Sequence, residues 1–346
     1  MQEVAVIGLG KLGLPLAVCL ADGGLRVHGV DLRGTDVLDT PEPCVKELAE
    51  RLMPSGRLTI GTEVPRDIDN VIILVNTPVI NSVYSTHQIE HALSTVPKGT
   101  FTVLSSTVSP GTCSRLGVDA YVPDFIALGQ AVQGFKYPDV YIIGYDAPSS
   151  LERADKIFSH AHLALRRPTG LGFRDAELAK IFLNNYIAMK ISYANMISQY
   201  TSDSSAICKA LGGDPRIGKA YFTPGPPWGG QCFPRDVGVL SNFTGQAGQL
   251  GRAVGEINNV QYFHMLKYVT DRAKGSVCVK GLAFKPGTDC TDNSPGMWLV
   301  AKLKELGYQV TADEEIADTI VHTHPAVQGS TGPSDRLTIN IWSMGS

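Results

Sequence analysis

Short apolar runs alternate with segments of helical length over the first half of the chain. Residues 4–7, 70–75, 101–105 and 140–143 are strand-like, and Pro, Gly, Thr or Ser interrupts the chain before each following helical stretch. The opening residues predict a strand, a glycine-rich turn, a helix near residues 12–21 and a second strand that ends at Asp31, which together make a βαβ unit. This alternation predicts an N-terminal, Rossmann-like, doubly wound parallel sheet with helices on both faces.

The second half begins with a long helical pattern. Residues 175–211 contain no Pro or Gly, and their apolar residues recur at helical spacing on more than one face. We expect one long central helix that is buried between domains or subunits. A loop rich in Gly and Pro at residues 223–234 follows, and then a helical segment that ends near residue 274.

The last part of the chain predicts a smaller α/β domain. Strands are expected at residues 276–284, 319–322 and 337–342, a helix near residues 297–306, and a flexible loop at residues 329–334. The chain is therefore expected to have three parts: a Rossmann-like domain over residues 1–170, a central helical domain with a glycine-rich loop over residues 171–274, and the smaller α/β domain over residues 275–346.

The composition is that of an ordinary globular protein. The 346 residues are 43% hydrophobic and 18% charged with a formal net charge of −3, so no basic excess indicates nucleic acid or a membrane surface as a partner. Seven scattered cysteines without a CxxC pair favour reduced thiols and a cytoplasmic location, and no apolar run is long enough to span a membrane. The pairs His160/His162 and His322/His324 lack further ligands at metal-like spacing, so we expect exposed histidines and no metal site.

A dinucleotide-binding pattern occupies the first βαβ unit. Gly8, Gly10 and Gly13 form GxGxxG between a strand and a helix, and Asp31 closes the next strand. Such glycines permit a tight turn and close approach to a pyrophosphate, while the carboxylate can accept hydrogen bonds from a ribose diol. The alternative is a glycine turn without a ligand. Asp31 would repel a 2′-phosphate, which favours NAD over NADP, although Arg33 leaves that preference open.

A cysteine stands in the stretch PWGGQCFPRD. A thiol becomes a nucleophile where its thiolate is favoured and accessible, and Gly229, Gly230 and Arg235 can provide these conditions for Cys232. Taken alone, one cysteine in a glycine loop is more often structural.

Six stretches change that balance: VAVIGLGKLGLPLA, NTP, SSTVSPGT, AELAKIFLNNYIAMKISYAN, GGQCFPRD and GLAFKPGTD. Together and in this order, they resemble the nucleotide-sugar 6-dehydrogenase family, the UDP-glucose and GDP-mannose dehydrogenases. The resemblance implies a four-electron, NAD-dependent oxidation of the C6 alcohol of a nucleotide sugar, with UDP-glucose as the default. Cys232 would form a thiohemiacetal and then a thioester. It also implies an NAD-binding first domain, a nucleotide-sugar-binding last domain, and a homodimer or higher homo-oligomer built on the central helix.

The resemblance assigns catalytic roles to six residues. It implies that Cys232 is the nucleophile, that Asp236 positions water, that Thr107 holds a catalytic water and that Lys180 and Asn184 stabilise the developing oxyanion. Asp124 stands where the family usually has glutamate and is a candidate base for thioester hydrolysis. The alternatives are a solvated helix face for Lys180 and Asn184, and a helix cap for Asp124.

The resemblance also implies binding residues. The expected cofactor contacts are Gly8, Gly10, Leu12, Gly13, Asp31, Thr77, Pro78 and Thr107. The expected substrate contacts are Phe125, Ile126, Lys180, Asn184, Arg216, Trp228, Gly229, Phe284 and Lys285. Arg216 would reach the nucleotide of the neighbouring subunit, since a cation suits a diphosphate. Arg216 and Lys285 have surface charges as their alternative reading.

Two positions and the length of the last domain depart from the family. Leu128 replaces a second glutamate, Asp292 replaces an arginine that commonly holds the cofactor, and the last domain is short. These departures keep open the same chemistry on another nucleotide sugar or a smaller nucleoside alcohol, or a protein that binds NAD and nucleotide sugar without turnover.

Overall fold

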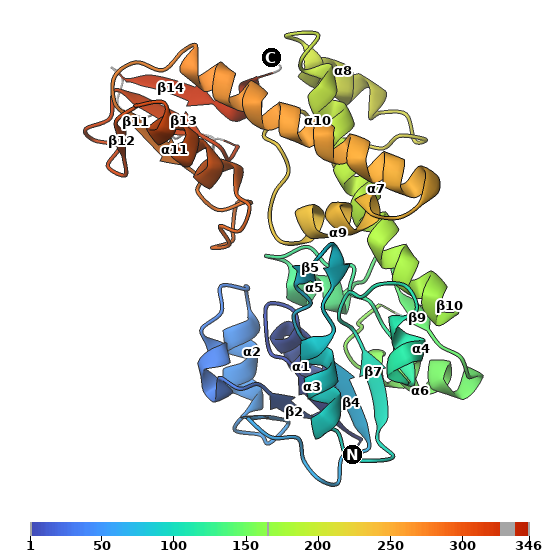
Figure 1. Ribbon diagram of the computed structural model, residues 1–346. Coiled ribbons are helices and arrows are strands. Elements are labelled where there is room, and N and C mark those ends of the chain that lie inside the picture. Colours follow the sequence, from blue (N-terminus) through green and yellow to red (C-terminus); the bar gives the residue numbers. More distant parts are fainter. Residues whose placement is uncertain (1, 165, 326–335, 345–346) are drawn as a thin grey trace. The chain divides into compact units, whose positions relative to one another are not determined.

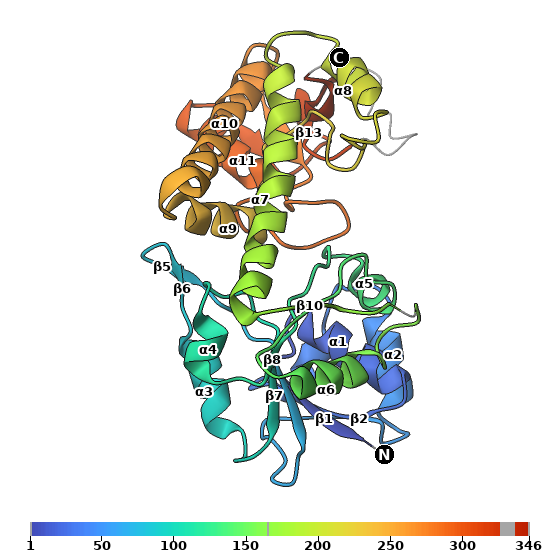
Figure 2. The same ribbon diagram turned by 90° about the vertical axis from the view of Figure 1, so that its right-hand side faces the viewer.

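The computed structural model describes residues 2–164, 166–325 and 336–344, so the loop expected at residues 329–334 lies outside the described residues. The chain divides into two compact units, Met1–Phe182 and Leu183–Ser346. Figures 1 and 2 show the elements of each unit. The expected division into three parts, with boundaries after residues 170 and 274, stays a prediction.

Within its described residues, the first unit contains an eight-stranded sheet in the order β10-β9-β8-β7-β4-β1-β2-β3. Neighbouring strands run parallel except β8 and β9. The strands are β1 Glu3–Ile7, β2 Arg26–Val30, β3 Leu58–Gly61, β4 Asn70–Ile73, β7 Phe101–Leu104, β8 Ala120–Tyr121, β9 Ile142–Gly144 and β10 Thr169–Leu171. A separate antiparallel hairpin pairs β5 Val79–Ile80 with β6 Val83–Tyr84.

Helices cover both faces of this sheet, as Figure 2 shows. Along β1, Val4 and Val6 belong to one buried cluster and Ala5 and Ile7 to the other, because successive strand residues point to opposite faces. The first cluster includes α1 Gly13–Asp22, α2 Val45–Leu52, α5 Ala131–Lys136 and α6 Pro148–Phe158; the second includes α3 His87–Thr95, α4 Thr112–Leu116 and the start of α7. The short helix η1 Gly34–Leu38 follows β2. The predicted doubly wound parallel sheet is confirmed.

The strand order places a switch point beside β1. The chain passes from β1 to β2 and β3 on one side, and then returns to β4 and β7 on the other side of β1. Connections leave the carboxyl ends of β1 and β4 in opposite directions, which opens the crevice where such folds bind nucleotides. The glycine turn after β1 lies at this crevice.

The central helix is shorter than the sequence predicts. α7 spans Phe173–Ile197, and a separate helix, α8 Ser204–Leu211, follows a turn, so the single helix expected over residues 175–211 was wrong. The interruption falls in a run of small polar residues, where Ser198 Oγ donates to the Asn195 carbonyl and the Asp203 N–H donates to Thr201 Oγ1. Short polar side chains that bond nearby backbone compete with helix continuation.

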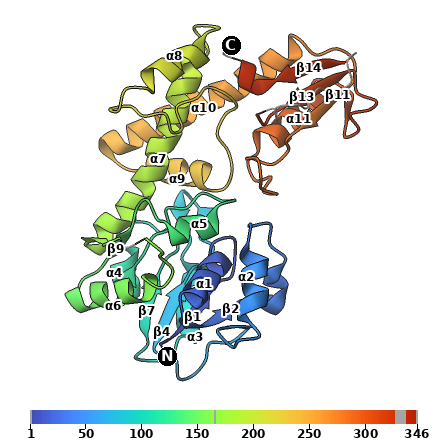
Figure 3. The ribbon, with the colours of Figure 1, turned by 180° about the vertical axis from the view of Figure 1, so that it is seen from behind.

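The second unit combines helices with a small parallel sheet. α9 Cys232–Ser241 and α10 Gly245–Thr270 replace the single helical segment expected up to residue 274. Within the described residues, four strands follow in the order β12-β11-β13-β14, with α11 Pro295–Glu305 beside them (Figure 3). The strands are β11 Val277–Lys280, β12 Val310–Thr311, β13 Thr319–His322 and β14 Leu337–Asn340, and η2 Ile341–Ser343 ends the described chain elements. β11 stops short of residue 284 because Gly281, at φ +87°, turns the chain.

No helix within the described ranges is both long enough and apolar enough to cross a membrane.

Candidate active site

The three glycines after β1 have different steric surroundings. A Cβ on Gly8 would lie 2.4 Å from the Leu74 carbonyl oxygen, and one on Gly13 would lie 1.8 Å from the Gly8 carbonyl oxygen, so these two are required by internal packing. A Cβ on Gly10 would meet no heavy atom within 4 Å. Gly10 is exposed at the mouth of the turn, just before α1 and the partly exposed Leu12. The turn therefore closes on itself and leaves space at Gly10, which fits the pyrophosphate of a dinucleotide.

Asp31 stands at the end of β2, facing the glycine turn. Its Oδ2 accepts a hydrogen bond from the Leu9 N–H at 2.9 Å, and its Oδ1 accepts one from Arg33 Nε at 3.0 Å. Burial raises the pKa of Asp31, but the hydrogen bonds from Arg33 and Leu9 outweigh it and hold the pKa below its usual value. The carboxylate is thus ionised and oriented. This geometry fits the binding of a ribose diol.

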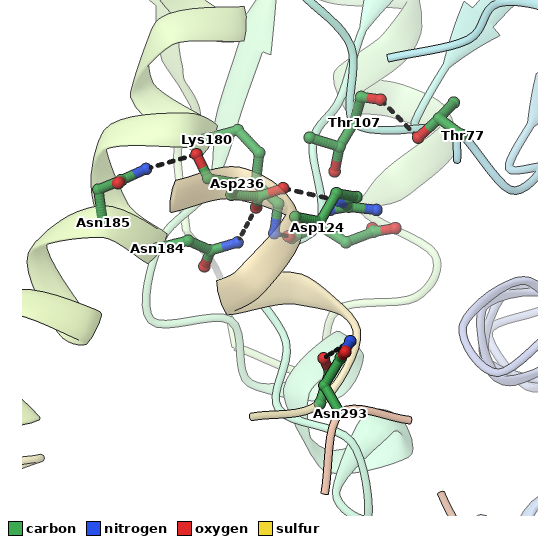
Figure 4. Close-up of polar contacts among 10 residues, drawn as sticks. Thr77, Thr107, Asp124, Lys180, Asn184, Asn185, Asp236 and Asn293 are labelled. Carbon is green, nitrogen blue, oxygen red and sulfur yellow. Dashed lines mark hydrogen bonds and ion pairs between the residues drawn. The ribbon is translucent and has the colours of Figure 1, made fainter. Parts of the chain in front are cut away.

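The loops after β4 and β7 are tied together. Thr77 Oγ1 donates to the Thr107 carbonyl at 2.8 Å, and Ser106 Oγ both accepts from the Val75 N–H and donates to its carbonyl. Thr77 is buried, whereas the neighbouring Pro78 is exposed and Thr107 is partly exposed. The structure thus joins the NTP and STV loops after the neighbouring parallel strands β4 and β7, and Figure 4 draws the contact between Thr77 and Thr107.

Asp124 and Lys180 meet in the first unit. Lys180 Nζ, on the first half of α7, donates to the Asp124 carbonyl oxygen and lies 5.3 Å from the centre of the Phe125 ring. Both side chains are buried, with 7% exposure for Asp124 and 8% for Lys180. Ile126, the next predicted contact, packs partly against the first cluster of the sheet. Because Lys180 is buried beside Asp124, it does not belong to a solvated face of α7.

The Asp124 carboxyl is strongly affected by its surroundings. Burial raises its pKa from 3.8 to about 7, and the nearby Lys180 charge opposes only part of this rise. Among the described residues, its Oδ2 atom has no hydrogen-bond partner. A carboxyl with this pKa can accept a proton near neutral pH, as a general base must.

Two buried glutamates that sequence reasoning missed support these loops. Glu177 accepts hydrogen bonds from the Gly111 and Cys113 N–H groups at the start of α4. Glu42 accepts from the Gly129 and Ala131 N–H groups at the start of α5. Free N–H groups at a helix start favour a carboxylate. Glu177 stands three residues before Lys180, so its place on the inner face of α7 was the available signal.

Asn184 and Asp236 meet in the second unit. Asn184 Nδ2 donates to Asp236 Oδ2, Arg235 Nε donates to Asp236 Oδ1 at 2.7 Å, and Asn185 Nδ2 donates to the Asp236 carbonyl at 3.1 Å (Figure 4). Asp236 is fully buried. Asn184 also lies four residues after Lys180 on α7, hence on the same face of that helix.

Cys232 is the first residue of α9 and is exposed. All seven cysteines lie within the described residues, and only Cys44 shares this exposure. Asp236 follows one turn later on the same helix, so the exposed thiol of Cys232 and this buried side chain are four residues apart on α9.

The expected substrate contacts of the second unit have varied surroundings. Arg216 is exposed and pairs with Asp214, with 2.6 Å between Nη2 and Oδ2. Trp228 is buried, and its Nε1 donates to Ser192 Oγ at 2.9 Å. The partly exposed Phe284 and Lys285 come after β11, and Gly229 lies in the buried stretch before Cys232.

The histidine pairs differ from expectation in one respect. His160, His162, His322 and His324 are partly buried rather than exposed. His160 Nδ1 contacts the Gly23 carbonyl at 2.9 Å, and His324 Nε2 contacts the Ala283 carbonyl at 2.8 Å. In the part of the chain that the structure describes, no group of three or more His, Cys, Asp or Glu side chains is arranged to hold a metal ion.

A doubly wound sheet with this glycine turn and with Asp31 directly after β2 is typical of a dinucleotide-binding protein. The chain belongs to the UDP-glucose/GDP-mannose dehydrogenase family. Residues 2–162 match the family's NAD binding domain, and residues 174–260 match its central domain. The match confirms the resemblance found from the sequence and NAD as the cofactor, and it makes the chain an NAD-dependent oxidoreductase of this family.

Curated relatives and solved structures agree with this assignment. The UDP-glucose 6-dehydrogenase TuaD of Bacillus subtilis (strain 168) is 29% identical over 357 residues, which cover 92% of this chain and 77% of TuaD. The UDP-glucose 6-dehydrogenase AglM of Haloferax volcanii is 28% identical over an alignment of 382 positions, gaps included, which covers 97% of this chain and 89% of AglM. A UDP-glucose dehydrogenase structure from the hyperthermophilic archaeon Pyrobaculum islandicum aligns with a TM-score of 0.86 at 25% identity, covering 99% of this chain and 94% of that one.

Proposed function

We propose that this protein oxidises the C6 alcohol of a nucleotide sugar, with UDP-glucose as the default, to the corresponding uronic acid. One observation carries the proposal within the family: the accessible Cys232 begins α9, one turn before a fully buried Asp236 that Asn184 holds. A thiol that only packs a core would be covered, as the thiols of Cys19 and Cys113 are. Bound NAD would accept one hydride in each of two successive oxidations.

The first oxidation converts the alcohol to an aldehyde. The hydroxyl gives its proton to water and the carbon would give a hydride to bound NAD, so negative charge develops on the sugar oxygen as the proton leaves. Lys180 and Asn184, on one face of α7, supply an ammonium and an amide that stabilise this charge. Gly8, Gly10, Leu12, Gly13, Asp31, Thr77, Pro78 and Thr107 hold the cofactor.

The second oxidation passes through Cys232. The thiolate forms a C–S bond to the aldehyde carbon as the C=O π bond breaks, and the oxygen takes up a proton from water to give a thiohemiacetal. Loss of that proton and of a hydride from the same carbon gives a thioester. Asp236 orders water beside the nucleophile, and Arg235 keeps its carboxylate paired, since Nε and Oδ1 are 2.7 Å apart.

Hydrolysis releases the product. A water held by Thr107 forms the new C–O bond and gives its proton to Asp124, and the C–S bond breaks to return the Cys232 thiolate. The raised pKa of Asp124, about 7, suits this role because the carboxylate can take up the proton near neutral pH. In total, one water enters and two hydrides leave each sugar.

Substrate binding is proposed for Phe125, Ile126, Lys180, Asn184, Arg216, Trp228, Gly229, Phe284 and Lys285. Leu128 favours a second candidate, the same reaction on another nucleotide sugar, because an apolar residue stands where a carboxylate would meet the sugar in the family. Partly exposed, it lies four residues after Asp124 in the same loop.

The assembly and the location are also proposed. Phe182, Tyr186 and Tyr193 lie along one face of α7 with exposures of 46%, 54% and 52%, which favours a homodimer that covers them. Arg216 would then reach the nucleotide held by the partner. A cytoplasmic location follows from the reduced thiols, since the sequence has seven scattered cysteines.

The test is a panel of nucleotide sugars with NADH counted against acid produced. UDP-glucose, or another member of the panel, is expected to yield two NADH per acid. A panel without NADH and without a covalent adduct on Cys232 would instead favour a protein that binds without turnover. A panel in which only another sugar reacts would select the second candidate.

A further inference from the structure

The backbone that leads to Cys232 is fixed first by buried amides of α10. Asn258 Oδ1 accepts from the Trp228 N–H at 2.9 Å, and Asn258 Nδ2 donates to the Trp228 carbonyl at 3.0 Å. Gln261 Nε2 donates to the Gly225 carbonyl at 2.7 Å. Both amides are buried, at 4% and 0% exposure. The start of the loop is therefore part of the helical core.

The end of the loop is held by another segment, residues 284–293. Asn293 Nδ2 donates to the Gly230 carbonyl at 3.0 Å, and Gln231 Nε2 donates to Asp292 Oδ2 at 2.7 Å (Figure 4 draws Asn293). A Cβ on Gly229 would lie 2.0 Å from the Asn293 carbonyl oxygen.

The same segment explains the second glycine. Gly230 has φ +80°, and a Cβ there would lie 2.7 Å from the Phe284 ring. The Phe284 N–H in turn donates to the Cys290 carbonyl at 2.8 Å, which closes residues 284–290 into a loop. The two glycines before Cys232 thus serve the close approach of this segment rather than free movement of the cysteine.

We propose that Asn293 is a positioning residue for Cys232. Its side chain holds the Gly230 carbonyl, two residues before Cys232, against the segment of residues 284–293. That segment begins with Phe284 and Lys285. The inference rests on the proposed function, in which those two residues bind the nucleotide sugar. Occupation of the nucleotide site would then act on the same segment that orients the thiolate. Asp292, which departs from the family, takes part in the same positioning because it accepts a hydrogen bond from Gln231.

The reaction sequence makes the proposal specific. Only the second oxidation uses the thiol, whereas the first needs the oxyanion-stabilising residues and the cofactor. Loss of the hydrogen bond from Asn293 to Gly230 is therefore expected to leave aldehyde formation unchanged and to slow the attack of Cys232 on the aldehyde. Free aldehyde would leave the enzyme, which a general loss of folding would not cause.

Asn293→Gly is the variant of choice. Asn293 has φ +47°, a conformation that glycine adopts without strain, so the change removes the side chain and keeps the backbone. Asn81→Gly is the matched control, because Asn81 has φ +52° in the β5–β6 turn. Asn81 is exposed and belongs to no proposed site.

Two measurements decide the question. The first is alkylation of Cys232 by iodoacetamide without substrate, read by peptide mass spectrometry against the exposed Cys44 as internal reference. In Asn293→Gly, the Cys232 to Cys44 ratio of rates is expected to fall about fivefold, the effect of one hydrogen bond. The second is turnover with an alkoxyamine, where this variant is expected to release trapped aldehyde and the wild type none.

An unchanged alkylation ratio in Asn293→Gly would overturn the proposal, as would an equal fall in Asn81→Gly. Absence of trapped aldehyde from a variant that still makes acid at the wild-type rate would also overturn it. Failure of the proposed function has a different signature, because wild-type enzyme would then make no NADH with any nucleotide sugar. The alkylation ratio would decide the role of Asn293 even in that case.

Discussion

Replacing Asp124 by Asn tests both the buried state of this carboxyl and its work as a base. Burial raises the pKa of Asp124 from 3.8 to about 7. The difference is about 3 pKa units, and at ~1.4 kcal/mol per unit the charged form costs about 4 kcal/mol in the folded protein. The amide introduced by Asp124→Asn would carry no charge at any pH, so the cost would disappear while the shape of the side chain is kept.

The sign of the pH dependence follows from proton binding. Between pH 3.8 and about 7, the folded protein keeps a proton on Asp124 that the unfolded chain has lost. The contribution of Asp124 to the free energy of unfolding is complete below its unfolded pKa of 3.8, and it is lost as the pH rises through its folded pKa of about 7. The free energy of unfolding of Asp124→Asn relative to wild type is therefore expected to rise by about 2 kcal/mol from about pH 5.5 to pH 7.

Urea unfolding followed by circular dichroism measures this difference, because titrations shared by the two proteins cancel. Wild-type hydrolysis of the thioester is expected to rise with pH around a midpoint near 7, the folded pKa of Asp124. The variant should be slower by about a hundredfold or more, with the thioester accumulating in rapid-quench samples. Parallel stability curves at all pH values would refute the burial argument, and a variant that hydrolyses at the wild-type rate would refute the role as base.

Two further predictions concern the cofactor and the assembly. Gly10→Val is expected to weaken NAD binding at least about tenfold in calorimetry, with an unchanged melting temperature because the space beside Gly10 is open. Gly13→Ala, in contrast, should fail to fold because its Cβ would lie 1.8 Å from a carbonyl oxygen. Mixing Arg216→Ala with Cys232→Ser subunits is expected to restore part of the activity that each lacks alone if arginine crosses the dimer interface, and a mixture as inactive as its components would exclude that arrangement.

The local geometry of the glycine turn and of α7 could be predicted from the sequence. GxGxxG after a strand predicts the turn because Gly8 and Gly13 each exclude a Cβ by short contacts to backbone, a requirement that leaves a visible pattern. The spacing of Lys180 and Asn184 predicts a shared face because a helix repeats every 3.6 residues. Both predictions depend on residues close together in the chain.

Long-range contacts left no comparable pattern. Glu42 reaches Gly129 across 87 residues, and Gln231 reaches Asp292 across 61, so neither pairing has a local signature. The central helix ended early for a different reason. The absence of Pro and Gly from residues 175–211 predicts a continuous helix, whereas the turn after Ile197 depends on Ser and Thr side chains that bond nearby backbone instead of extending the helix.

The most direct test of covalent catalysis by Cys232 is to measure the covalent state of its thiol during turnover. Wild-type protein mixed with NAD and UDP-glucose, quenched in acid within milliseconds and digested, is predicted to carry the glucuronyl nucleotide on the peptide that contains Cys232. Cys232→Ser is predicted to make no acid at a measurable rate, since a serine hydroxyl is a weaker nucleophile and a poorer leaving group than a thiolate. Unmodified Cys232 throughout turnover, together with normal acid production by Cys232→Ser, would contradict the account.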